Sequence, residues 1–216
     1  MDAIETIMTT RAIRRFTDQP VADADVETCL LAAQQAPSGG NVQPQQYFVF
    51  TDPGRKAEVA RWYKRAFDRY EATLDAPQEF RDDKARRSWE RTRDASRHLA
   101  DYLQDAPVIV LFLQARIPWE PRDEEGPMDI GRLDASVYPS VQNFCIAARS
   151  LGLGTALTTV IRVYGDAALE ALGVPPGRFE IAALIPVGYP SGNFGVAPRK
   201  PAAAVTHWNT WGDKRR

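Results

Sequence analysis

Apolar side chains recur every three or four residues along several stretches of the chain, which is typical of helices that bury one face. The clearest case is residues 24–36, where Val26, Cys29, Leu30 and Ala33 share one face. Because Cys29 lies on this apolar face, we interpret it as a buried structural thiol. The same spacing predicts further helices over residues 2–10, 56–71, 86–103, 133–151 and 166–172.

Short apolar runs bounded by turn residues predict the strands. Residues 108–113 are continuously apolar, which is typical of a strand buried on both faces. Three further runs predict strands at 46–51, 155–160 and 181–187. Residues 117–131 contain three prolines and several acids, so we expect a loop there. This order of elements predicts a single α+β (mixed α/β) domain over residues 1–216, with helices flanking a mixed sheet of four to five strands.

Composition and charge exclude several classes of protein. The 216 residues are 44% hydrophobic and 25% charged, with a net charge of -1, so we expect neither disorder nor a nucleic-acid partner. The longest apolar run is far shorter than the roughly 20 residues that span a bilayer, so we expect no membrane partner. The chain contains two cysteines and two histidines. Their scarcity argues against a metal site, and with no signal-like N-terminus it favours a cytoplasmic location.

A cluster of arginines follows the first predicted helix. Arg11, Arg14 and Arg15 lie within five residues, and the planar guanidinium donors of arginine match phosphate oxygens. The cluster is equally typical of a solvated basic turn at the end of a helix.

The loop after the helix at 24–36 is rich in small polar groups. Ser38, Asn41 and Gln43 offer neutral donors and acceptors, and the adjacent glycines allow a ligand to approach the backbone closely. Such groups suit a flat, uncharged heterocycle. An ordinary connection between a helix and a strand has the same composition.

Two later segments also carry polar groups at strand ends. Residues 154–159 include Thr158 and Thr159, which are either ligand-facing hydroxyls or plain strand formers. Residues 185–190 end a buried strand at a glycine, and a basic pair follows at 199–200.

Taken together and in this order, the segments resemble the nitroreductase family of flavoproteins. The family opens with Arg-Arg-Ser-x-Arg-x-Phe and continues with Ala-Pro-Ser-x-x-Asn-x-Gln-Pro. It closes with Leu-Gly-x-Gly-Thr, Pro-x-Gly-Tyr-Pro and Arg-Lys-Pro. The resemblance implies an intertwined homodimer with FMN bound at the subunit interface, where Ser38 and Gly39 approach the flavin of the other subunit.

The resemblance also implies which residues bind FMN. They are Arg11, Ala12, Ile13, Arg14, Arg15, Ser38, Gly39, Asn41, Gln43, Thr158, Thr159, Pro186, Val187, Gly188 and Arg199. Within this set the arginines are expected at the phosphate and the threonines near N5 of the ring. The sequence departs from the family pattern at Thr10, where an arginine is usual, and at Ala12, where a serine is usual.

The implied activity is an FMN-dependent oxidation of NADH or NADPH with transfer to nitroaromatic, quinone or similar small conjugated acceptors by a ping-pong scheme. The flavin carries the chemistry, so no catalytic side chain is required. A competing hypothesis is a reductive dehalogenase of the iodotyrosine deiodinase type, for which Tyr70, Glu71 and Lys84 lie in the relevant region. A flavin-binding protein without turnover and an interaction module without a cofactor are also compatible with the sequence.

Two regions have expected roles beyond the flavin. The helical insertion at about 56–103 is expected to cover the substrate face, with Trp62, Tyr63, Phe67 and Tyr70 as substrate-lining residues. Simple packing between helices would explain the same aromatics. The tail at about 190–216 is expected to embrace the partner subunit.

Overall fold

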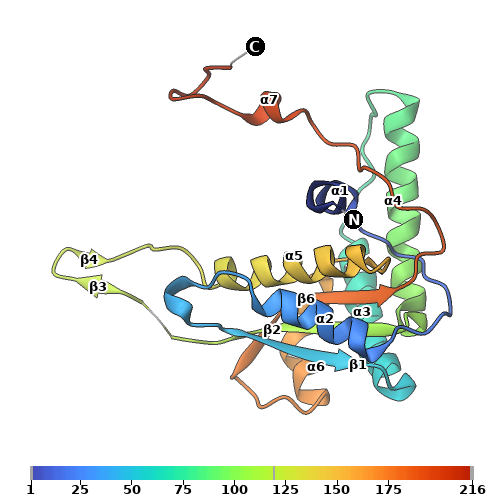
Figure 1. Ribbon diagram of the computed structural model, residues 1–216, viewed down its shortest axis with the longest axis horizontal. Helices are drawn as coiled ribbons and strands as arrows, with labels where there is room; N and C mark the ends of the chain where they lie inside the picture. Colours follow the sequence, from blue (N-terminus) through green and yellow to red (C-terminus); the bar gives the residue numbers. More distant parts are fainter. Residues whose placement is uncertain (1, 119, 215–216) are drawn as a thin grey trace.

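A four-stranded sheet forms the centre of the computed structural model, which describes residues 2–118 and 120–214 (Figure 1). In spatial order the strands are β1 (Gln45–Phe50), β2 (Val108–Ala115), β6 (Phe179–Gly188) and β5 (Gly154–Thr155). Neighbouring strands are antiparallel, and a parallel bridge between Ala12 and Thr155 adds to the edge at β5. The expected α+β class is therefore confirmed, and the mixed character of the sheet is confined to this edge.

The packing of β2 explains why its sequence is apolar without interruption. Ile109, Leu111 and Leu113 point into one hydrophobic core, and Val110 and Phe112 point into the other. Successive side chains of a strand face opposite sides of the sheet, so a strand covered on both faces needs an apolar residue at every position.

Helices cover both faces of the sheet. On one side lie α2 (Asp23–Gln34) and α5 (Asp134–Ser150). On the other side lie α3 (Pro53–Glu71), α4 (Asp83–Tyr102) and α6 (Gly165–Ala171). The remaining short helices are α1 (Ala3–Thr9), η1 (Gly39–Asn41), η2 (Leu103–Asp105), η3 (Val160–Tyr164) and α7 (Ala202–Val205).

Aspartate caps set the starts of α3 and α4. The Asp52 side chain accepts a hydrogen bond from the Arg55 backbone N–H at 2.9 Å, and Asp82 accepts one from Ala85 at 2.7 Å. Each cap satisfies an N–H group that has no partner within the first turn of the helix. Both helices therefore begin three residues before the positions that the apolar spacing predicts.

The predicted strand at 155–160 is wrong in its extent. Only Gly154–Thr155 forms a strand, and the chain pairs with β6 once more at Thr158, through two backbone hydrogen bonds to Leu184. It then turns into η3, which begins at Val160. The β-branched residues raised strand propensity here, but the tertiary pairing extends no further. The loop predicted at 117–131 contains a small hairpin of β3 (Arg122–Asp123) and β4 (Gly126–Pro127).

The segment after α1 is held on both sides by backbone hydrogen bonds. The Ile13 N–H donates to the Thr155 carbonyl at 2.8 Å, and the Thr17 N–H donates to the Tyr189 carbonyl at 2.9 Å. The Ser191 N–H returns a bond to the Arg15 carbonyl at 3.1 Å. The arginine cluster therefore sits on a fixed piece of backbone beside the end of β6.

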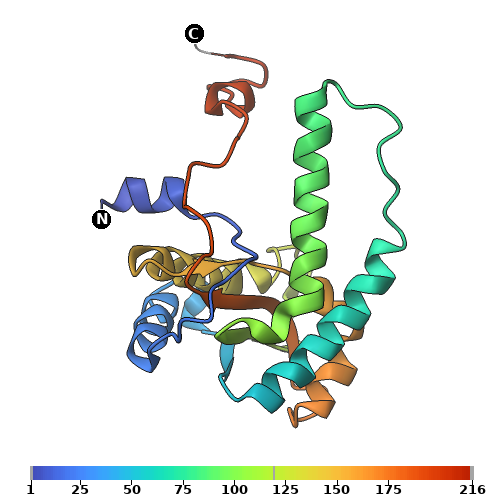
Figure 2. The same ribbon diagram turned by 90° about the vertical axis from the view of Figure 1, so that its right-hand side faces the viewer.

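Two parts project from the sheet and its helices. Figure 2 shows α4 standing upright, with the tail rising between it and α1. The tail carries exposed apolar side chains, of which Trp211 is 90% exposed. Among the described residues, no helix combines the length and apolar character needed to cross a membrane.

Gly154 is where the arginine segment packs most closely against the sheet. A Cβ atom at this position would lie 2.8 Å from Cγ2 of Ile13, so Gly154→Ala forces Ile13 to move. Overpacking of this kind costs about 1–3 kcal/mol. We expect Gly154→Ala to unfold at a temperature lower by several degrees in differential scanning calorimetry. The matched control is Gly195→Ala, where a Cβ meets nothing within 4 Å; equal melting temperatures would contradict close packing at Gly154.

Candidate functional site

A basic cavity lies between the arginine segment, α4 and the start of the tail. Its volume is about 540 Å³. Arg11, Arg14 and Arg15 line it from the segment after α1, and Arg91 lines it from α4. In the part of the chain that the structure describes, none of these four guanidinium groups pairs with a carboxylate. The cavity therefore carries uncompensated positive charge, which suits a multiply charged anion such as a phosphate.

Arg14 and Arg15 have different surroundings in the basic cavity. Burial lowers the pKa of Arg14, and the charge of Arg11 lowers it further, whereas Tyr63 opposes the shift. Nη1 of Arg15 lies 2.9 Å from Nδ1 of His98. An arginine donates and cannot accept a hydrogen bond, so this imidazole nitrogen is the acceptor and carries no proton.

An aromatic cavity adjoins the basic cavity. It has a volume of about 350 Å³ and shares Arg14 and Thr92 with its neighbour. Its walls include Tyr63, Phe67, Tyr70, Trp89, Leu157 and Thr158. One continuous region thus combines a cationic end with a flat, largely apolar end that bears hydroxyl groups.

The hydroxyl groups of Tyr63 and Thr158 meet in the wall of the aromatic cavity. Their oxygen atoms lie 3.4 Å apart, and Tyr63 is only 2% exposed. Burial raises the pKa of Tyr63, and the hydrogen bond to Thr158 and the charge of Arg14 work in the other direction. The phenol is therefore protonated at neutral pH.

An ion-pair network joins α3 to α4 at the outer wall of the aromatic cavity. Arg97 binds both Glu71 and Asp68, the latter at 2.6 Å, and Lys64 binds Asp101 at 2.7 Å. The hydrogen bond to Glu71, with that to Asp68, raises the pKa of Arg97. The network fixes the spacing of the two helices that wall the cavity.

The structure brings about half of the sequence-predicted residues to these two cavities. Those in the basic cavity are Arg11, Ala12, Ile13, Arg14 and Arg15. Those in the aromatic cavity are Arg14, Tyr63, Phe67, Tyr70 and Thr158. Arg199 donates a hydrogen bond to the carbonyl of Pro198, and Pro198 lines the basic cavity.

Other predicted residues lie elsewhere. Trp62 packs against Tyr164 with ring centroids 6.2 Å apart, on a different side of α3 from Tyr63. Thr159 is exposed and precedes η3. Three residues are buried within β6 and line neither cavity: Pro186, Val187 and Gly188.

The polar loop at 38–43 lies at the other end of α2 from the arginine segment (Figure 1). Oγ of Ser38 accepts a hydrogen bond from the Gln43 N–H at 2.8 Å, and the Gln43 amide donates to Asn41 at 2.9 Å. The Gly39 N–H donates to Oγ of Ser136 at 3.1 Å. In one chain this loop contributes to neither the basic nor the aromatic cavity.

The sequence reasoning missed the contribution of α4 to the basic cavity. Ser88, Arg91, Thr92 and Ala95 line it at intervals of three and four residues. This spacing defines one face of a helix, so the signal was present in the sequence. The start of the tail, residues 191–193, was also missed.

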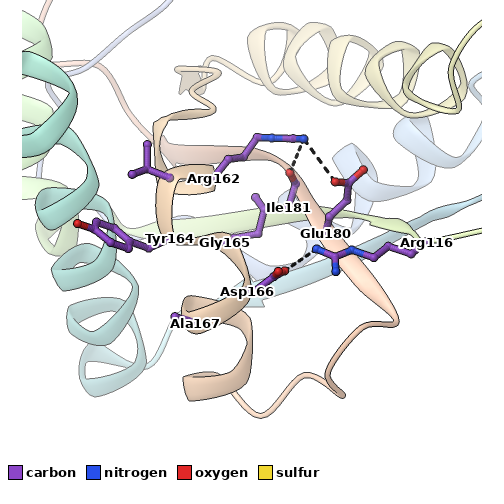
Figure 3. A pocket seen from close by; sticks show the side chains of 9 residues that line it. Arg116, Arg162, Tyr164, Gly165, Asp166, Ala167, Glu180 and Ile181 are labelled. Atoms are coloured by element: carbon purple, nitrogen blue, oxygen red, sulfur yellow. Dashed lines mark hydrogen bonds and ion pairs between the residues drawn. The ribbon is translucent and has the colours of Figure 1, made fainter. Parts of the chain in front are cut away.

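A further cavity of about 350 Å³ lies beside η3 and α6 (Figure 3). Here Arg116 pairs with Asp166 at 2.5 Å, and Arg162 pairs with Glu180 at 3.4 Å while donating to the Ile181 carbonyl. Both guanidinium groups are already neutralised. This cavity therefore lacks the free charge that distinguishes the basic cavity.

This chain is similar in sequence and in fold to known proteins. The model of the Nitroreductase family matches residues 7–189. The FMN reductase (NADPH) of Bacillus subtilis (strain 168) is 27% identical over 97% of this chain and 74% of its own length. A protein of Desulfovibrio desulfuricans, solved in complex with FMN, is 25% identical, with 98% of both chains covered and a TM-score of 0.69. Oxidized iodotyrosine deiodinase, solved with FMN and 3-iodo-L-tyrosine, shares the fold with a TM-score of 0.71 at 21% identity, over 97% of this chain and 100% of that one. The family match covers most of the sequence and confirms the resemblance: the chain belongs to the nitroreductase family.

Proposed function

We propose that this protein is an FMN-dependent NAD(P)H oxidoreductase that reduces nitroaromatic, quinone or similar small conjugated acceptors. The observation that carries the proposal is that the basic cavity adjoins the aromatic cavity. The two cavities share Arg14 and Thr92. This pairing matches a ligand with a dianionic phosphate at one end and a flat ring system at the other. Two similar proteins, one named FMN reductase (NADPH) and one solved with FMN, support it.

The residues of the two cavities fit FMN. The unpaired guanidinium groups of Arg11, Arg14 and Arg91 would hold its phosphate, with Arg199 close by behind Pro198. The hydroxyl of Thr158 would lie at the ring edge, and Phe67 and Tyr70 offer apolar surface for the acceptor. The helices α3 and α4, held together by their ion pairs, would limit the access of water as a lid.

FMN, when bound, supplies hydride transfer between NAD(P)H and the acceptor. The side chains of the chain itself then need only bind, orient and exchange protons. Neither cysteine competes as a nucleophile, because burial raises the pKa of Cys29 to about 12 and that of Cys145 to about 11. Both thiols lie in the core that α2 and α5 form with the sheet, and neither lines the two cavities.

A dehalogenase acting on an amino acid is the weaker candidate. Such a substrate needs free charges at its ammonium and carboxylate groups. Glu71 lines the aromatic cavity but is already held by Arg97 and, at 3.6 Å, by Arg93. Lys84 lies in the first turn of α4 and is absent from the cavity wall.

The decisive experiment is anaerobic reduction of the purified, FMN-loaded protein. NADPH or NADH should bleach the flavin absorbance, and menadione or nitrofurazone should restore it over many turnovers. The initial rates with the two nucleotides define the preferred donor. If neither nucleotide bleaches the flavin, the protein binds FMN without turnover; if 3-iodotyrosine alone reoxidises it, the dehalogenase assignment replaces ours.

Phosphate anchoring by the basic cavity predicts a specific loss of affinity. A charge-assisted hydrogen bond contributes about 1.5–3 kcal/mol, so Arg14→Ala should raise the Kd for FMN by roughly ten- to a hundredfold. The measurement is fluorescence quenching of FMN on titration with apoprotein. The matched control is Arg69→Ala, because Arg69 is exposed and lies 5.8 Å from the Tyr164 ring. Equal affinities of the two variants would remove Arg14 from the binding site.

We also propose that the active form is a homodimer whose site is shared between subunits. The loop at 38–43 is remote from the arginines of its own chain, so Ser38, Gly39, Asn41 and Gln43 would complete the site of the partner. Apolar side chains are exposed on α1 and on the tail, including Ile4, Val205 and Trp211. A partner subunit would cover such surface. A cytoplasmic location stays a prediction from the sequence, and cell fractionation tests it.

Removal of the tail tests this assembly. A chain lacking residues 203–216 should form monomers or aggregates in multi-angle light scattering, because it loses the apolar groups that would bury on the partner. It should also lose FMN during gel filtration, since each site would lack the contribution of the second chain. A truncated protein that elutes as a flavin-loaded dimer contradicts the role of the tail.

A further inference from the structure

The aromatic cavity contains one buried phenol whose surroundings suit a proton donor. The Tyr63 hydroxyl lies 3.4 Å from Oγ1 of Thr158, in the wall of the aromatic cavity that Arg14 also lines. Thr158 is itself fixed, because its backbone N–H and carbonyl both pair with Leu184, at 3.0 and 2.8 Å. The phenol is thus oriented by a rigid neighbour.

The reduction of a quinone or nitro group requires more than electrons. A quinone gains a hydride and one proton to become a hydroquinone, and the proton forms an O–H bond on the acceptor oxygen. NAD(P)H provides the hydride by way of FMN in the proposed function, on which this inference rests. The proton must come from water or from a side chain in the cavity, and a positioned donor is faster.

We propose that Tyr63 is a catalytic residue that donates this proton to the oxygen of the reduced acceptor. The O–H bond of Tyr63 breaks as the new O–H bond forms, and the tyrosinate regains a proton from solvent before the next cycle. No further oxidant or reductant is needed.

The surroundings of Tyr63 support this assignment over the other groups in the cavity. Glu71 forms ion pairs with Arg97 and Arg93. Tyr70 is 43% exposed, so water competes with it as the proton donor. Threonine hydroxyls are far weaker acids than phenols. Tyr63 alone combines burial, a fixed hydrogen-bond partner and a neighbouring cation.

The cation is Arg14, which lines the same cavity. Donation leaves a negative charge on the phenol oxygen, and in a buried site such a charge is costly without a counter-charge. The guanidinium of Arg14, which has no carboxylate partner among the described residues, supplies it. The same arginine would hold FMN and stabilise the spent donor.

The test compares two acceptors in the FMN-loaded enzyme. Menadione takes up a proton when it is reduced by two electrons, whereas ferricyanide takes one electron and no proton. Tyr63→Phe keeps the ring and removes the hydroxyl. We expect it to lower the ratio of menadione turnover to ferricyanide turnover at least tenfold, in line with the roughly 10²–10⁴-fold effect of general acids.

The matched control is Tyr102→Phe, which removes a phenol from α4 outside both cavities. Its ratio should equal that of the wild type. A ratio in Tyr63→Phe within twofold of the wild type overturns the proposal. Failure of the wild type to reduce even ferricyanide with either NADPH or NADH would instead refute the proposed oxidoreductase activity.

A second measurement needs no variant at Tyr63. In D₂O, the wild-type ratio of menadione to ferricyanide turnover should fall, because only menadione reduction includes the proton transfer. An unchanged ratio in D₂O overturns the proposal even if Tyr63→Phe does not retain FMN.

Discussion

The backbone hydrogen bonds that hold residues 12–17 are the constraint on which the site depends. Ile13 is tied to Thr155 on one side and Thr17 to Tyr189 on the other. These bonds fix the backbone of three arginines that line one cavity, although like charges repel and no carboxylate among the described residues pairs with them. Packing maintains the arrangement, since Ile13 closes over Gly154, where no larger residue fits. A binding anion would relieve the repulsion, so the fold is arranged to gain stability from its ligand.

The proposed lid of α3 and α4 depends on a different interaction, the ion pairs between the two helices. The ion pairs of Arg97 and Lys64 with acids on the facing helix are partly exposed, so each contributes at most about 1 kcal/mol to stability. Their effect is mainly geometric, because they set the distance between α3 and α4 and thereby the width of the aromatic cavity. They also occupy Glu71. The same contacts that shape the aromatic cavity therefore reduce its capacity to recognise a zwitterion.

Local sequence predicted the elements well and their ends less well. The uninterrupted apolar run of β2 and the apolar faces of α2 and α5 were readable because burial dictates these positions. The pairing of Thr158 with Leu184 was not readable, because it depends on a strand far along the chain. The same limit applied to the site. The arginine segment was found from its own residues. The sequence could not show that Tyr63 lines the cavity and Trp62 does not, because this depends on which side of α3 faces the cavity.

The separation of the two proposed FMN-binding segments also could not be read from the sequence. Residues 11–15 and 38–43 lie toward opposite ends of α2, whose 12 residues make it about 18 Å long (Figure 1). In one chain the loop at 38–43 lines neither the basic nor the aromatic cavity. If both segments contact the same FMN, as proposed, the loop at 38–43 comes from a second copy of the chain. On this proposal, binding of FMN would depend on assembly of two chains, and under twofold symmetry one interface would complete two sites at once.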